Sequence, residues 1–150
     1  MNSILGKFKK FLLTLTDEEL EYLGIARINT NENFSNDLNE FINNTLENLG
    51  IPSHERGTSY LKTAIRIAYE NPDSLKQLTN KLYPETAKIH NSTSAVIQGH
   101  MRSVIAFGHV RGNKDFWKEV FTSDVHYRNF EVSNGYFLKG IVNYLNRQLQ

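Results

Sequence analysis

The stretch from residue 83 to residue 113 concentrates side chains that are suited to binding a phosphate group. Its first half contains a lysine and a run of short polar residues, namely Lys88, Asn91, Ser92, Thr93 and Ser94. A cation, hydroxyl groups and an amide all donate hydrogen bonds to phosphate oxygens, and free N–H groups at a helix N-terminus do the same. A single lysine is ordinarily just a solvated surface charge. Whether these residues bind phosphate therefore depends on the secondary structure that brings them together.

The same stretch predicts a short helix, a tight turn and a longer helix. Pro84 suits the first turn of a helix, where its missing N–H is no loss, and this helix would run through Ile89. His90 and Asn91 would end it, because asparagine tolerates the left-handed conformation that a tight turn needs. The N-cap of the second helix, which spans about 93–110, would be Ser92 or Thr93.

The second helix has two different faces. One carries apolar or small residues at helical spacing: Ile97, Met101, Val104, Ile105 and Gly108. The opposite face begins with small and polar residues: Ala95, Gln98, Gly99 and Arg102. A short helix, a turn and a second helix with a polar N-terminal face form the layout that enters a DNA major groove. The alternative is an ordinary helical hairpin whose polar face meets water.

Residue types that would indicate catalysis or metal binding are sparse. The chain has no cysteine, so disulfides and thiolate metal sites are excluded. His100 and His109 are nine residues apart and would lie on opposite sides of one helix, which disfavours a shared metal. No glycine-rich phosphate loop and no serine–histidine–acid partnership is evident. We therefore expect no enzyme activity, no catalytic residue, no metal and no cofactor.

Charge is unevenly distributed although the formal net charge is only +1. Residues 16–49 contain eight acids and one base, whereas residues 81–118 contain six bases and two acids. The basic half includes the predicted recognition helix, as nucleic-acid binding requires. No apolar stretch approaches the ~20 residues that span a bilayer, and no signal peptide is evident, so we expect a cytoplasmic protein.

The rest of the chain is also predicted to be helical. Residues 2–14 form a basic amphipathic pattern that would pack on the parent domain or a partner, or lie on a membrane surface. A capping box from Thr16 to Glu19 opens a helix that ends near Gly24, and residues 25–33 would form a connector. Residues 1–33 are thus interpreted as an N-terminal helical extension and residues 34–150 as the main domain.

Within the main domain, capping residues predict where the other helices begin and end. Ser35 would cap a helix ending near Gly50, and Thr58 or Ser59 would cap the next one. Further helices are expected after Asn71-Pro72, from Lys114 to Phe121, and after Ser133 or Asn134. The fold class is therefore all-α, a bundle of about six helices that contains a helix-turn-helix.

Three motifs carry a resemblance to a known family. They are GTSYLKTAIRIAYENPDSL, LYPETAKIHNST and RGNKDFWKEVF, in this order and spacing. They resemble the DNA-binding effector domain of the response regulator that initiates sporulation in endospore-forming bacteria. The likeness extends from near Leu46 to near Leu149 and is strongest between Gly57 and Phe121. Only about fifty residues precede it, and they read as helices, so the resemblance implies the output domain without a receiver domain.

The resemblance also implies which residues would contact bases. A glutamate and two arginines that contact bases in the family align with Gln98, Gly99 and Arg102, and only Arg102 keeps its type. Arginine forms bidentate hydrogen bonds with guanine, and glutamine can address an adenine edge. Gly99 reads no base and costs the helix roughly 1 kcal/mol relative to alanine.

The function that follows is a sequence-preferring, bacterial DNA-binding protein that acts as a transcription regulator. It would bind double-stranded DNA as a homodimer or as tandem copies. The competing interpretation is a protein–protein interaction module that keeps the fold but has lost DNA readout through Gly99.

Overall fold

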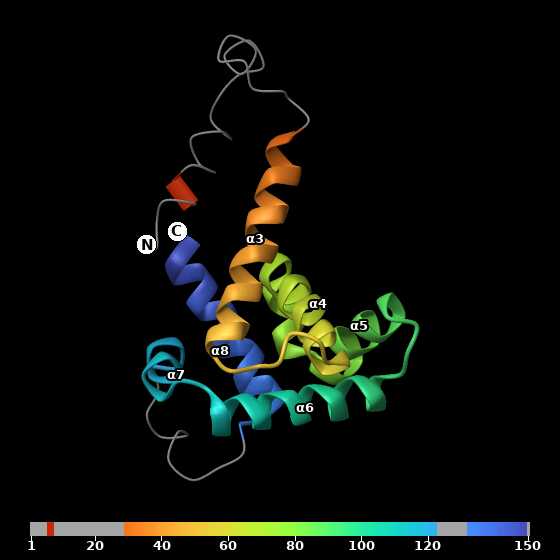
Figure 1. Ribbon diagram of the computed structural model, residues 1–150. Helices are drawn as coiled ribbons and strands as arrows, with labels where there is room; N and C mark the ends of the chain where they lie inside the picture. The colour runs from red at the N-terminus through yellow and green to blue at the C-terminus, as the bar shows by residue number, and fades with distance from the viewer. Residues whose placement is uncertain (1–5, 8–28, 123–131, 150) are drawn as a thin grey trace.

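A computed structural model describes residues 6–7, 29–122 and 132–149 of the chain (Figure 1). Over these residues it contains helices and no strand, which confirms the predicted all-α class. The longer elements are α3 (Asn29–Asn48), α4 (Arg56–Glu70), α5 (Tyr83–Ile89), α6 (Ser94–Arg111), α7 (Lys114–Val120) and α8 (Asn134–Leu149). The helix predicted at 16–24, all but residues 6–7 of the one predicted at 2–14, and residues 123–131 lie outside the described residues.

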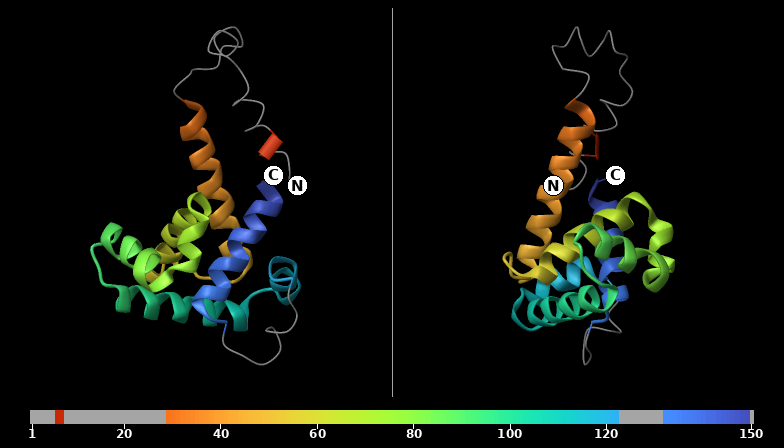
Figure 2. Two further views of the ribbon diagram at one scale, coloured as in Figure 1. Left: turned by 180° about the vertical axis from the view of Figure 1, so that it is seen from behind. Right: turned by 90° about the vertical axis from the view of Figure 1, so that its right-hand side faces the viewer.

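Helix α4 lies at the centre of the domain and packs against α6, α8, α5 and α3. Helix α6 runs across one end of the bundle, and α3 and α8 rise away from it (Figure 1). Seen from behind, α8 crosses α6 with its N-terminal end (Figure 2), and the two helices are in contact. Helices α4 and α8 each bury an apolar face: Tyr60, Leu61, Ala64, Ile65 and Ala68 in α4, and Phe137, Ile141, Tyr144 and Leu145 in α8.

Two helix starts differ from the sequence-based prediction. Helix α3 begins at Asn29, so residues 29–33 are helical rather than a connector, and Ser35 lies inside the helix instead of capping it. The Ser35 hydroxyl accepts a hydrogen bond from the Arg66 guanidinium of α4. Helix α4 begins at Arg56, with Glu55 at the N-cap position, so neither Thr58 nor Ser59 caps it. In both cases the hydroxyl residue near the helix start sits inside the helix rather than at its N-cap.

The segment after Asn71-Pro72 also departs from the predicted single helix. Pro72 opens a 3₁₀-helix, η1 (Pro72–Lys76), which is followed by a π-helical turn, η2 (Leu78–Leu82). Leu82 is fully buried, whereas Leu75 and Leu78 are only partly buried. The buried Ser74 hydroxyl donates to the Asn71 carbonyl at 2.7 Å, which favours a tighter local turn over a regular helix.

A tryptophan joins α7 to the ends of α3 and α6. The indole N–H of Trp117 donates to the carbonyl oxygens of Leu49 at 2.9 Å and Gly108 at 3.1 Å. Both carbonyls belong to helix ends, where backbone acceptors lack intrahelical partners or share them. Gly50 has a φ of +80°, which confirms its predicted role as the residue that ends α3. This junction fixes the C-terminal end of α6 relative to the rest of the bundle.

Candidate nucleic-acid interface

The predicted short helix, turn and long helix are all present. Pro84 lies in the first turn of α5, and α5 ends at Ile89 with His90 as its C-cap. Asn91 has a φ of +52°, the left-handed conformation expected of it, and among the described residues it is the one non-glycine position with a positive φ. Thr93 rather than Ser92 is the N-cap of α6, since its side chain accepts a hydrogen bond from the Val96 N–H at 3.3 Å.

The inner face of α6 is fixed by close packing against α4. All of its predicted inward residues are buried: Ile97, Met101, Val104, Ile105 and Gly108. Gly57 of α4 brings the two helices unusually close, because a Cβ atom at that position would lie 2.2 Å from the His100 carbonyl oxygen. The rotation of α6 about its own axis is therefore determined by its core contacts, which also determine the residues that face outward.

Three of the four predicted outward residues lie together on the exposed face of α6. Ala95, Gly99 and Arg102 are exposed, and a Cβ atom at Gly99 would have no neighbour within 4 Å. Gln98 differs, because it is partly buried on the flank that faces α8. Its backbone carbonyl accepts a hydrogen bond from Asn134 Nδ2 at 3.1 Å.

Tyr83 lies beside Asn134, on the same flank as Gln98, and the positive charge of Arg102 acts on the Tyr83 hydroxyl. Burial raises the pKa of the Tyr83 hydroxyl above its usual value. A hydrogen bond with the Asn134 side chain and the positive charge of Arg102 act in the opposite direction on this pKa. Arg102 is thus both exposed to solvent and near the α5–α8 flank.

The polar residues of the turn surround the start of α6. Lys88, Asn91 and Thr93 are exposed, whereas Ser92 and Ser94 are partly buried. The Ser92 N–H donates to the Ala87 carbonyl at 2.8 Å, which closes the turn onto α5. The structure therefore brings the predicted phosphate-binding residues to one end of α6, next to the exposed face that carries Ala95, Gly99 and Arg102.

An exposed apolar strip on the second half of α6 was missed by the sequence reasoning. Phe107 is 45 % exposed and Val110 is 76 % exposed, and the Arg111 guanidinium lies 5.1 Å from the centre of the Phe107 ring. Near the other end of the unit, Ile89 and Val96 are exposed as well. The only signal in the sequence is that large apolar residues occur outside the inner stripe of α6.

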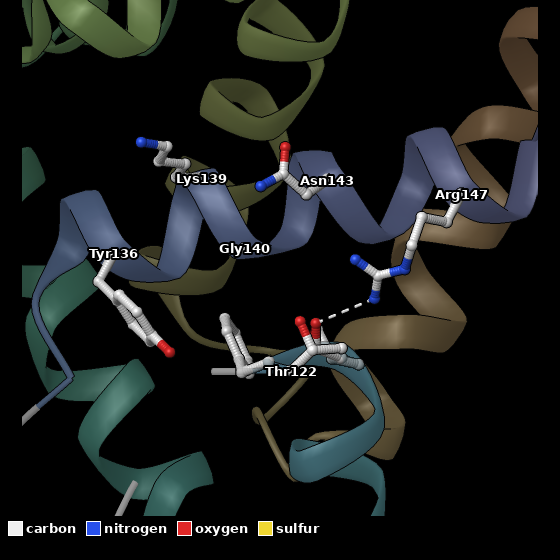
Figure 3. A pocket seen from close by; sticks show the side chains of 8 residues that line it. Thr122, Tyr136, Lys139, Gly140, Asn143 and Arg147 are labelled. Carbon is white, nitrogen blue, oxygen red and sulfur yellow. Dashed lines mark hydrogen bonds between the residues drawn. The ribbon is translucent and has the colours of Figure 1, made fainter. Parts of the chain in front are cut away.

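A separate hollow of about 310 Å³ lies between the end of α7 and α8 (Figure 3). The Arg147 guanidinium points toward the end of α7 and donates to the carbonyl oxygens of Glu119 at 3.3 Å and Val120 at 3.2 Å. Lys139 and Asn143 point away from that guanidinium (Figure 3). Arg147 therefore binds the backbone at the end of α7, and within the described residues no set of charged groups converges on this hollow.

Metal binding and membrane insertion find no support in the described part of the chain. No cluster of three or more histidine, aspartate or glutamate side chains there could hold a metal ion. None of the described helices is both long and apolar enough to cross a membrane.

The chain matches a model of a protein family over more than half of its length. Residues 42–145 match the family described as "Sporulation initiation factor Spo0A C terminal". The matched range begins within α3, contains all of α4 to α7 and ends within α8. It therefore includes the whole helix–turn–helix unit, and it confirms the resemblance drawn from the three sequence motifs.

Proposed function

Because the chain belongs to the Spo0A C-terminal family, whose members are DNA-binding domains of transcription regulators, we propose that it regulates transcription by placing α6 in the DNA major groove. The family is a regulatory DNA-binding domain rather than an enzyme family. The observation that carries the docking proposal is the exposed N-terminal half of α6, whose opposite face is fully buried against α4. A helix held in this way can enter a groove without disturbing the core.

In this arrangement Arg102 reads a base and the turn residues hold the backbone. Arg102 is the exposed arginine in the N-terminal half of α6, and its guanidinium can form two hydrogen bonds with guanine O6 and N7. Ala95 and Gly99 leave room for close approach, and the alanine methyl can contact a thymine methyl group. Gln98, partly buried on the α8 flank, would reach only a base at the edge of the contact.

Phosphate contacts would fix the register of the helix on the duplex. The residues proposed for them are Lys88, Asn91, Ser92, Thr93 and Ser94, all at the N-terminal end of α6. Such contacts position a protein on DNA without reading its sequence. Two copies of the chain, either as a homodimer or in tandem, would extend the contact over two neighbouring sites.

Selection of bound duplexes from a random DNA library tests the proposal. We expect an enriched sequence of a few base pairs and binding that weakens steeply as salt is added. Mobility shifts on the enriched duplex and on a scrambled duplex of the same composition provide the control. A folded protein that shifts neither duplex at low salt would contradict the proposal.

Replacing Lys88 with alanine should weaken binding to all duplexes alike. A lysine that neutralises one phosphate releases about one counterion, so the slope of log affinity against log salt should fall by about one unit. Titrations at several salt concentrations, on enriched and scrambled duplexes, measure this slope. An effect confined to the enriched duplex would mean that Lys88 contacts a base instead.

Replacing Gly99 with arginine should restore the residue type found at this position in the family. No atom lies within 4 Å of the Cβ position, so the side chain can be added without a clash. We expect roughly tenfold tighter binding to the sequence that the sporulation regulators prefer, as one added base contact contributes ~1–3 kcal/mol. If the fold is intact by circular dichroism and affinity for that sequence is unchanged, α6 docks differently.

A second candidate function rests on the exposed apolar strip of α6. Phe107 and Val110 present aromatic and aliphatic surface that a protein partner could bury. In this case the fold would be kept while DNA readout is lost, and Gly99 would be the residue at which it was lost. Absence of any mobility shift at low salt, with a folded protein, favours this candidate over the first.

A further inference from the structure

We propose that a hollow between the start of α4 and the α5–α6 turn binds one phosphate of the DNA backbone, with Arg56 as its principal cation. This inference rests on the proposed function. The hollow has a volume of about 390 Å³. Helix α4 contributes Arg56, Ser59 and Tyr60 to its lining, and the turn contributes His90 and its neighbours Asn91 and Ser92. The proposed interface therefore includes residues of α4, a helix that precedes the helix–turn–helix unit.

The hollow lies where a DNA backbone would pass. Val96, in the first turn of α6, completes its lining, and it follows Ala95 directly in the sequence. One wall of the hollow is thus the flank of the exposed α6 face. A major groove is about 12 Å wide and is bounded by the phosphates of both strands. If α6 occupies the groove, one strand must run along this flank.

The chemistry of the lining suits a phosphate group. The Arg56 side chain is exposed and makes no hydrogen bond or ion pair within the described residues, whereas that of Arg66 in the same helix pairs with Glu70 at 3.5 Å. Among the residues that the structure describes, no acidic side chain lines the hollow. The hydroxyls of Ser59 and Ser92 and the amide of Asn91 add neutral donors around the guanidinium. Arginine is the side chain best matched to a phosphate, because its planar N–H groups can bind two oxygens at once.

His90 shapes the hollow and is held in place by α4. Its Nε2 atom lies 2.6 Å from the Thr63 hydroxyl, and its ring meets the Tyr60 ring edge-on, with 4.9 Å between the ring centres. The contact with Thr63 joins the turn to α4 across 27 residues of sequence. The hollow is consequently a preformed feature in which the turn and α4 keep a fixed spacing.

A backbone phosphate fits this open hollow better than a free phosphorylated molecule does. Arg56, Ser59 and Asn91 are all exposed, so a small ligand would keep much of its surface in water. Small-molecule sites usually enclose 70–90 % of their ligand, as a general rule. A DNA phosphate is instead delivered and held by the rest of the interface, and it needs only a shallow seat.

The test compares the salt dependence of duplex binding for Arg56→Gln and Lys139→Gln. Both substitutions remove one exposed positive charge, but Lys139 lies on α8, outside the proposed interface. Arg56→Gln should lower the slope of log affinity against log salt by about one unit and weaken enriched and scrambled duplexes equally. Lys139→Gln should leave the slope unchanged. Arg56→Lys keeps the positive charge, so its slope should stay close to that of the wild-type chain.

Three results would contradict the proposal, and they show whether the site alone or the proposed function as a whole is wrong. An unchanged slope for Arg56→Gln, while Lys88→Ala lowers the slope, would show that DNA binds but not through this hollow. If the wild-type chain binds no duplex at low salt, both the proposed function and this phosphate site are wrong. Saturable binding of inorganic phosphate without DNA, seen as shifts of the amide signals of residues 56–60 and 90–92, would assign the hollow to a free phosphorylated ligand instead.

Discussion

Alanine in place of Gly57 is expected to lower the free energy of unfolding by about 3 kcal/mol, at the upper end of the range for overpacked cores. A Cβ atom there would lie 2.2 Å from the carbonyl oxygen and 2.7 Å from the carbonyl carbon of His100. Both are backbone atoms of α6, so no side chain can rotate away to make room. Relief requires α4 and α6 to separate, which would loosen the packing of Ile97 and Met101 as well.

The matched substitution is Gly99→Ala, on the outer side of α6. It should raise the free energy of unfolding by up to about 1 kcal/mol, since alanine is the better helix former and nothing crowds the new methyl group. Urea unfolding followed by circular dichroism measures both changes. If Gly57→Ala proves as stable as the parent, α4 and α6 do not approach as closely as described.

Replacing Arg102 with alanine should weaken binding to the enriched duplex by about 1–3 kcal/mol, roughly fivefold to more than a hundredfold. The residue is exposed on α6, one turn after Gln98 and on the same face as Ala95 and Gly99. Losing a bidentate contact to guanine removes discrimination at one base pair. Binding to a scrambled duplex should change far less, because that binding depends on phosphate contacts.

Competition titrations with duplexes that carry each base at the affected position measure the Arg102 effect. Preference for guanine there should disappear in Arg102→Ala and persist in Lys88→Ala. Equal losses on enriched and scrambled duplexes would show instead that Arg102 contacts only the backbone.

Local sequence patterns predicted most of the helix–turn–helix unit. The five-residue inner stripe of α6 follows from helical periodicity alone, and all five positions are buried. The left-handed Asn91 and the capping Thr93 follow from properties that short polar residues have wherever they occur. These features depend on neighbours within a few residues, which a sequence displays directly.

The features that were missed depend on contacts between distant segments. Ser35 looks like a cap until Arg66, 31 residues later, is found donating to its hydroxyl. Thr58 looks like a cap as well, but it is buried and its hydroxyl donates to the Pro52 carbonyl in the loop before α4. Gln98 has the right spacing for the outer face, yet it is only partly exposed, and Asn134 of α8 donates a hydrogen bond to its backbone carbonyl.

In the candidate site, too, residues close in sequence were predicted and residues brought together by distant contacts were not. The phosphate-binding residues around the turn are neighbours in sequence and were found together. Arg56 and Ser59 were not found, because only the packing of α4 against the turn brings them beside Asn91 and Ser92. A contact such as that between Thr63 and His90 cannot be predicted from a pattern in a single sequence.

The most direct test of the proposed docking maps DNA contacts on the protein by nuclear magnetic resonance. Duplex DNA is added at low salt to the isotope-labelled chain, and the amide and arginine side-chain signals are followed. The account predicts that the largest changes fall on residues 88–102 and on Arg56, whereas Lys139 and Arg147 beside the α7–α8 hollow stay unchanged. Changes centred on Phe107 and Val110, or on α8, with residues 88–102 unaffected, would contradict it.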